Sequence, residues 1–214
     1  GYGIYDRAGS GNIVHNSGTV TWDTGGTSTM YALSTFNNIT TTTSSTTLRW
    51  FSALTLAGTL TVAANTTVHE HSSAGGAFTV GGDVSVSGTL GDSSAYSAYE
   101  FGSLTIATGG TYNATSGTTT ITAENSSGFA IQNSGTFTHN KGLVDIDMAV
   151  PTTTQASNGP YYDFTQSDAA TDFYPAEAFE VMNNLYFVGD FEFQNNAHHL
   201  TVHGNMTIGN GSTT

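Results

Sequence analysis

Pairs of apolar residues, with one residue between the members of each pair, recur along this chain at an almost constant interval. The intervals between successive pairs are 24, 26 and 25 residues. The pairs are Leu54/Leu56, Phe78/Val80, Leu104/Ile106 and Phe129/Ile131. A fixed period in the mid-twenties with two or three short strands per period is typical of a solenoid, in which each coil buries its inner row against the coils above and below. The spacing therefore predicts stacked coils of about 25 residues.

Within each period, apolar and polar residues alternate. From Phe78 to Leu90 the positions of one parity are Phe, Val, Gly, Val, Val, Gly and Leu. This alternation predicts strands with one buried face, and glycine at the same parity marks the corners of a coil. The sequence thus predicts an all-β fold, a parallel β-solenoid. The alternative is an antiparallel β-sandwich, which shows the same alternation but does not require a repeated coil length.

A longer repeat is superimposed on the short one. The segment "NSGTVT" at Asn16 recurs as "NSGTFT" at Asn133, an offset of 133 − 16 = 117 residues. The segment "LTLAGTLTVAANTT" at Leu54 recurs as "LTVHGNMTIGNGST" at Leu200, an offset of 200 − 54 = 146 residues. The second copy therefore contains an insertion of 146 − 117 = 29 residues.

The insertion divides the chain into three parts. We expect solenoid coils over residues 1–147 and 179–214, continuing beyond the given chain, and an insertion over residues 148–178 that forms a protruding loop or an extra coil. The insertion contains all three prolines, which disrupt strand ladders, so part of it is expected to leave the coil.

The insertion also contains aromatic residues interleaved with aspartates. Aromatic side chains on a protruding loop are typical anchors for a protein or sugar partner. The same rings could instead cover the flank of the solenoid or fill a wider coil. The candidate partner-binding residues are Tyr161, Tyr162, Asp163, Phe164, Asp168, Phe173 and Tyr174.

The charge of the chain excludes several classes of partner. Its 214 residues carry a net charge of −13, with only three basic residues. Binding to nucleic acid needs clustered Lys and Arg, and so does adhesion to anionic lipid. No apolar run is long enough to span a membrane. We therefore expect neither a nucleic-acid partner nor membrane insertion.

Two histidines in the segment "VHEH", His69 and His71, fall on one side of a predicted strand. Two imidazoles in this arrangement can share a metal ion, and a threefold assembly would supply six nitrogens. Two solvated histidines at a turn would produce the same pattern. His69 and His71 are therefore a speculative metal site.

Carboxylate pairs could support catalysis or calcium binding, but their setting argues against both. Asp145/Asp147 and Asp190/Glu192 each lie in the outward row of a strand whose apolar residues occupy the inner face. The chain contains no GxSxG, no HExxH, no Gly-rich phosphate loop and no Cys. We expect a protein that is not an enzyme and that needs no cofactor.

The repeats "NSGTFTHN", "FNNIT" and "LTLAGTLTVAANTTV" resemble those of large β-helical surface proteins of tailed phages, especially marine ones. They are also similar to repeats in bacterial filamentous adhesins and autotransporter passengers. The resemblance covers nearly the whole chain except the insertion, and no catalytic residue carries over. It implies a right-handed parallel β-helix, often trimeric in phage fibres, at a virion surface or outside the cell. Some phage spike tips hold iron through an HxH motif like that of His69 and His71, although here the motif lies in mid-chain.

These observations favour a structural virion-surface segment, such as a fibre, spike or capsid-decoration protein, that acts as a rigid scaffold and contacts a host or partner. The alternatives are a bacterial extracellular adhesin or surface-filament subunit and, further away, a glycan-degrading tailspike. The expected partners are other copies of the chain in a homo-oligomer (a trimer in the fibre case), other structural subunits, and a host surface glycan or protein.

Overall fold

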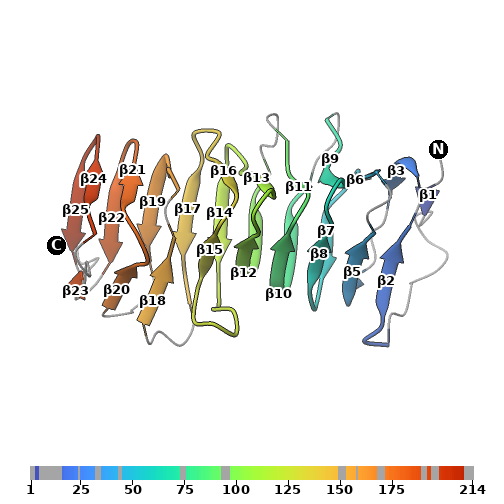
Figure 1. Ribbon diagram of the computed structural model, residues 1–214, viewed down its shortest axis with the longest axis horizontal. Coiled ribbons are helices and arrows are strands. Elements are labelled where there is room, and N and C mark those ends of the chain that lie inside the picture. The colour runs from blue at the N-terminus through green and yellow to red at the C-terminus, as the bar shows by residue number, and fades with distance from the viewer. Residues whose placement is uncertain are drawn as a thin grey trace.

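The computed structural model describes residues 3–4, 16–23, 25–31, 35–42, 45–72, 76–92, 97–148, 153–157, 159–167, 172–188, 192–193 and 198–209. These ranges contain β-strands and no helix. The strands stack into an elongated rod, with β1 and β2 at one end and β24 and β25 at the other (Figure 1). None of the described residues belongs to a helix that could span a membrane.

The described strands lie on three faces, which the chain visits in a fixed order. The first face contains β4 (Thr35–Phe36), β7 (Leu54–Leu56), β14 (Thr118–Ile121), β17 (Leu143–Ile146), β19 (Asp163–Gln166), β22 (Leu185–Val188) and β25 (Met206–Gly209). The second face contains β2 (Thr19–Trp22), β5 (Asn38–Thr41), β8 (Leu60–Val62), β15 (Ile131–Asn133), β18 (Thr153–Ala156), β20 (Asp172–Pro175) and β23 (Glu192–Phe193). Two longer strands, β10 (Phe78–Val86) and β12 (Tyr99–Ile106), run along both of these faces.

The third face closes the coil. It contains β1 (Gly3–Ile4), β3 (Gly26–Met30), β6 (Thr46–Trp50), β9 (Thr67–Glu70), β11 (Thr89–Leu90), β13 (Thr111–Asn113), β16 (Thr136–Thr138), β21 (Phe179–Val181) and β24 (Leu200–Val202). Its outward row includes a ladder of threonines on successive coils, formed by Thr27, Thr47, Thr67, Thr89, Thr111 and Thr136.

Neighbouring strands are parallel at every pairing among the described residues. Strands of one face pair in the order in which the chain supplies them, for example β2-β5-β8 and β14-β17-β19-β22-β25. This arrangement confirms the predicted parallel β-solenoid. The antiparallel sandwich, which needs strands that reverse direction, does not describe these residues.

The coils are shorter than the predicted 25 residues. Paired residues are 20 positions apart between β12 and β14, and 21 between β19 and β22 and between β22 and β25. Longer coils separate β7 from β10, by 24 positions, and β14 from β17, by 25. The sequence estimate linked Phe78 with Leu104, which lie on different faces. Because both faces carry the same apolar pattern, the pattern alone does not separate one face from the next.

The segment 148–178 lies within the coils where the structure describes it. Its strands β18, β19 and β20 pair in parallel with strands of the preceding and following coils. Tyr161 supplies the third face through a parallel bridge to Val181. These residues therefore form part of the sheets.

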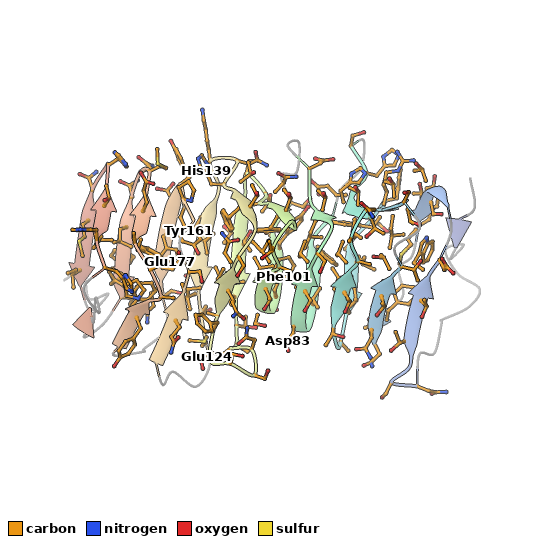
Figure 2. All side chains as sticks on the ribbon, in the orientation of Figure 1. Asp83, Phe101, Glu124, His139, Tyr161 and Glu177 are labelled. Atoms are coloured by element: carbon orange, nitrogen blue, oxygen red, sulfur yellow. The ribbon has the colours of Figure 1, made fainter. Side chains whose placement is uncertain are left out.

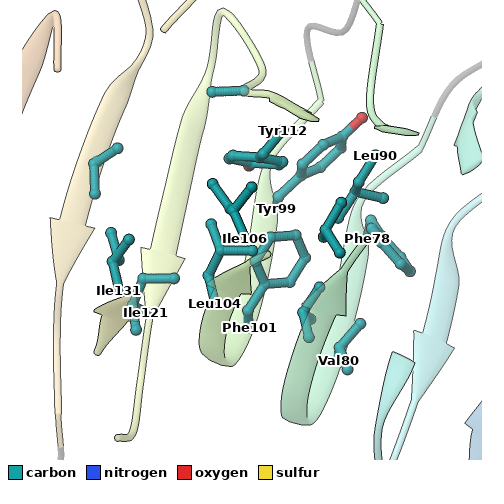
Figure 3. Packing of buried hydrophobic residues seen from close by; sticks show 14 of the residues in the cluster. Phe78, Val80, Leu90, Tyr99, Phe101, Leu104, Ile106, Tyr112, Ile121 and Ile131 are labelled. Atoms are coloured by element: carbon teal, nitrogen blue, oxygen red, sulfur yellow. The ribbon is translucent and has the colours of Figure 1, made fainter. Parts of the chain in front are cut away.

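One hydrophobic core runs along the rod from Trp22 to Phe187. Figure 3 shows side chains of successive coils, among them Phe78, Phe101 and Tyr112, projecting into the same interior. Nine buried rings form a continuous chain of contacts with centroids 4.5 to 6.0 Å apart. They are Trp50, Phe78, Phe101, Tyr112, Phe137, Tyr161, Phe179, Phe173 and Phe187. Since burial of one such ring contributes about 1.5 to 3 kcal/mol, this aromatic row is a major source of stability.

Candidate functional site

Three of the predicted partner-binding aromatics belong to the core instead. Tyr161, Phe164 and Phe173 are each 0% exposed. The Tyr161 ring packs on Phe164 at 5.0 Å, and its hydroxyl donates a 2.6 Å hydrogen bond to the Ser157 carbonyl oxygen. Burial raises the pKa of the Tyr161 phenol far above its usual range, with a smaller contribution from the charge of Glu177. These rings fill the coil, so a partner cannot reach them.

The remaining candidates of this group lie nearer the surface. Tyr162 is half-buried and packs on the His139 ring at a centroid distance of 5.4 Å. Figure 2 shows the contrast between His139 at the margin of the rod and Tyr161 inside it. Tyr174 is half-buried in β20. Asp168 lies outside the described residues.

Asp163 has a structural role that its place in the insertion did not suggest. Its Oδ1 atom accepts hydrogen bonds from the Asn183 side-chain amide at 2.9 Å, from the Asn184 backbone N–H at 2.9 Å and from the Asn184 side-chain amide at 3.1 Å. Asn184 Oδ1 in turn accepts from the backbone and side-chain N–H groups of Asn205, at 3.4 and 3.3 Å. We call Asp163, Asn184 and Asn205 the corner ladder, because the Asp163 and Asn184 oxygens each accept hydrogen bonds from the next coil at the corner between the third and first faces.

The two histidines of the speculative metal site are engaged in separate contacts. His69 Nδ1 lies 2.9 Å from Asp92 Oδ2, on the next coil. The His71 ring packs on Phe51 at a centroid distance of 5.2 Å, and Phe51 packs on Tyr31 at 5.0 Å. Within the described ranges, no group of three or more His, Asp or Glu side chains is placed to hold a metal ion. The two side chains are thus involved in contacts between coils.

An open hollow of about 430 Å³ lies at the corner between the second and third faces. Turns of three successive coils line it, through residues 64–67, 87–89 and 108–109. These residues are Ala, Asn, Thr, Ser and Gly, so the lining offers hydroxyls, one side-chain amide and backbone groups. It contains no carboxylate, imidazole or amine that could act as an acid or a base. This chemistry suits water or a weakly held polar group.

The last described strand, β25, pairs with β22 and has no following coil among the described residues. Its inward-row residues Met206 and Ile208 are 43% and 56% exposed, although their partners in β22, Leu185 and Phe187, are each 1% exposed. Met182, one coil earlier, is the remaining large hydrophobic side chain that is exposed in the described part of the chain. The end surface thus consists of Met206 and Ile208 together with Asn205, the last member of the corner ladder.

Local sequence explains the shape of this end surface. Gly204 precedes Asn205 at the corner, where a Cβ atom would collide with the Asn183 carbonyl oxygen. The tight corner brings Asn205 onto Asn184 and starts β25 in register with β22. The pair of asparagines that ends at Asn184 also occurs at Asn38, where it lies between the first and second faces instead of the third and first.

Comparisons of the chain with protein-family models, with curated proteins and with solved structures find no match. The function is therefore argued from the fold and from the contacts between its coils.

Proposed function

We propose that this chain is a rigid structural segment of a virion surface, such as part of a fibre, spike or capsid decoration. Its role is to project or connect other subunits, and its location is the virion surface or the extracellular medium. The observation that carries the proposal is the single core that runs through successive parallel coils from Trp22 to Phe187. A rod of this kind resists bending because each coil is hydrogen-bonded to two neighbours along its length.

The disposition of polar groups supports a scaffold rather than a catalyst. The outward row of the third face includes a threonine ladder, and the side chain of Asp163 accepts hydrogen bonds from the next coil. His69 and Asp92 pair with each other between coils. Polar side chains that could have formed a reactive cluster thus stabilise the stacking of the coils.

An antibody raised against the purified chain tests this proposal. In immunoelectron microscopy of particles and cells from the source culture, we expect label on virions. Label confined to bacterial cell surfaces would contradict the virion assignment and support the adhesin alternative. A parallel screen against host polysaccharides should release no oligosaccharide, and release of defined fragments would contradict a purely structural role.

A further inference from the structure

We infer that the outward side of strands β3, β6 and β9 is a binding site for sugar polymers that carry carboxylate groups, and that Arg49 recognises the carboxylate. The inference adds a ligand to the proposed scaffold role and does not depend on whether the rod belongs to a virion. It follows from the rings, hydroxyls and charge on three successive coils, which lie side by side near the β1 end of the rod (Figure 1).

The parallel register aligns the outward side chains of these three coils in columns that run along the rod. Hydrogen bonds from the Phe51 N–H to the Met30 carbonyl oxygen, at 2.9 Å, and from the His71 N–H to the Trp50 carbonyl oxygen, at 2.8 Å, extend the ladder beyond the strands. Because neighbouring coils are about 4.8 Å apart, each column of three is roughly 10 Å long. The columns are Thr27, Thr47 and Thr67; Thr29, Arg49 and His69; and Tyr31, Phe51 and His71. Each of these side chains is at least partly exposed.

The third column provides an apolar strip. The ring centroids of Tyr31 and Phe51 are 5.0 Å apart, and those of Phe51 and His71 are 5.2 Å apart. Their mutual packing already restricts the rings, so binding a ligand costs little additional side-chain entropy. Partly exposed aromatic rings pack well against the C–H face of a sugar ring, since that face is apolar although the hydroxyls around it are polar.

Arg49, in the middle of the second column, is a cation that forms no ion pair among the described residues. The chain has 16 acidic residues and only three Lys or Arg, so a carboxylate partner would be the expected arrangement. The hydrogen bond from Arg49 Nη2 to the Thr29 hydroxyl is long, at 3.4 Å, and Arg49 Nε is buried without a hydrogen-bond partner. A carboxylate bound at the two Nη groups would supply the anion that this guanidinium lacks.

The acidic residues of the neighbouring positions do not occupy this surface. None of the side chains in the three columns is acidic. Glu70 belongs to the inward row and is 1% exposed. Asp92 Oδ2 lies 2.9 Å from His69 Nδ1, so this carboxylate already has an imidazole partner. An anion that approaches the second column therefore meets the Arg49 guanidinium without a competing carboxylate in the same row.

The fold favours a sugar polymer over an extended peptide. A peptide that joins a sheet needs a free strand edge, whereas β3, β6 and β9 each pair with a strand on both sides. A sugar polymer needs no such edge, because threonine hydroxyls and ring surfaces meet its own hydroxyls and C–H groups. A flat surface holds one sugar weakly, so a polymer that offers many equivalent units is the expected ligand.

Isothermal titration calorimetry with carboxylated polymers tests the inference. The probes are polygalacturonate, alginate and polysialate, each compared with the same polymer after reduction of its carboxylates to alcohols. We expect the chain to bind at least one of the three, and reduction to weaken that binding at least about tenfold, because charge-assisted hydrogen bonds are lost. Binding to none of them, or equal binding to the charged and reduced forms, would overturn the inference.

The variant Arg49→Gln should weaken the binding at least about tenfold. Its matched control is Lys141→Gln, which removes the same charge from an exposed residue that follows β16 and lies outside the three columns. The control should bind as the wild type does. Equal losses from the two substitutions would show a general attraction between polymer and protein charge, and they would overturn the inference, as would an unchanged affinity of Arg49→Gln.

The ring column has a test of its own. Phe51→Leu keeps an apolar side chain but removes the ring, and it should weaken the binding about threefold or more. Circular dichroism verifies that each variant keeps its β content. An unchanged affinity would overturn the assignment of the rings to the site. Failure of all these tests would leave the scaffold role intact, because antibody labelling tests that role independently.

Discussion

Strands β22 and β25 lie on the same face and have the same alternation of inward and outward residues, yet the inward residues of β22 are buried and those of β25 are exposed. Leu185 and Phe187 of β22 are each 1% exposed, whereas Met206 and Ile208 of β25 are 43% and 56% exposed. Strand β22 lies between β19 and β25 and pairs with both. Strand β25 pairs with β22 alone among the described strands. In a solenoid, burial of a strand thus depends on the coil that follows it as much as on its own sequence.

The covered coils contain three buried tyrosines, so their stability should fall at alkaline pH. Burial raises the pKa of the phenols of Tyr99, Tyr112 and Tyr161 above the ordinary value of 10.0. In the unfolded chain these phenols ionise near that value, so their contribution to stability is fully present below about pH 10 and is lost as the pH rises further. We expect cooperative loss of β structure above about pH 10, with the phenolate absorbance appearing in the same transition.

Circular dichroism and ultraviolet absorbance, recorded on the same samples, check this expectation. Ionisation of all tyrosines near pH 10 with β structure retained would contradict it.

Substitution of one inward residue in each region sharpens the comparison. Phe164→Ala should lower the free energy of unfolding by about 3 to 5 kcal/mol, because it leaves a cavity among rings that are fully buried. Ile208→Ala should change it by less than about 0.5 kcal/mol, because little burial is lost. Denaturant unfolding at low protein concentration, where copies do not associate, measures both values. Equal effects of the two substitutions would show that the end surface is covered in solution.

The corner ladder offers a smaller contrast of the same kind. Asp163→Ala removes an oxygen that accepts three hydrogen bonds from the next coil, so we expect a loss of roughly 1 to 2 kcal/mol. Asn205→Ala removes only the hydrogen bond that the Asn205 side-chain amide donates to Asn184 at an exposed position, and should cost less than about 0.5 kcal/mol. Thermal unfolding of the two variants measures both losses of stability. A larger loss for Asn205→Ala than for Asp163→Ala would contradict the role given to Asp163.

The repeats in the sequence describe corners rather than whole coils. The words "LTLAGTLTV" and "LTVHGNMTI" both form a strand, a glycine corner and a second strand. The first passes from the first face to the second, through β7 and β8, while the other passes from the third face to the first, through β24 and β25. Because the faces are alike, one sequence segment can form different corners. The two copies of the long repeat therefore lie at different corners of the coil.

The aromatic residues of the insertion show a similar limit. Their number and their neighbouring aspartates suited a binding loop, and the presence of proline suggested departure from the coil. In the fold, Pro175 ends β20 and Phe173 packs on Phe179 at a ring centroid distance of 5.1 Å. The alternation Phe164 to Gln166, in which both side chains point inward, was a signal for a strand that the aromatic content obscured.

The order of residues along the chain was enough to define strands with one apolar row, glycine corners and a fold of stacked parallel coils, because these depend on a period of two within strands and on a recurring interval between them. Only the assembled coils decided which face each strand joins and that Tyr161 lies inside. Those outcomes depend on the neighbour in the next coil, about 21 residues away, which local patterns do not encode.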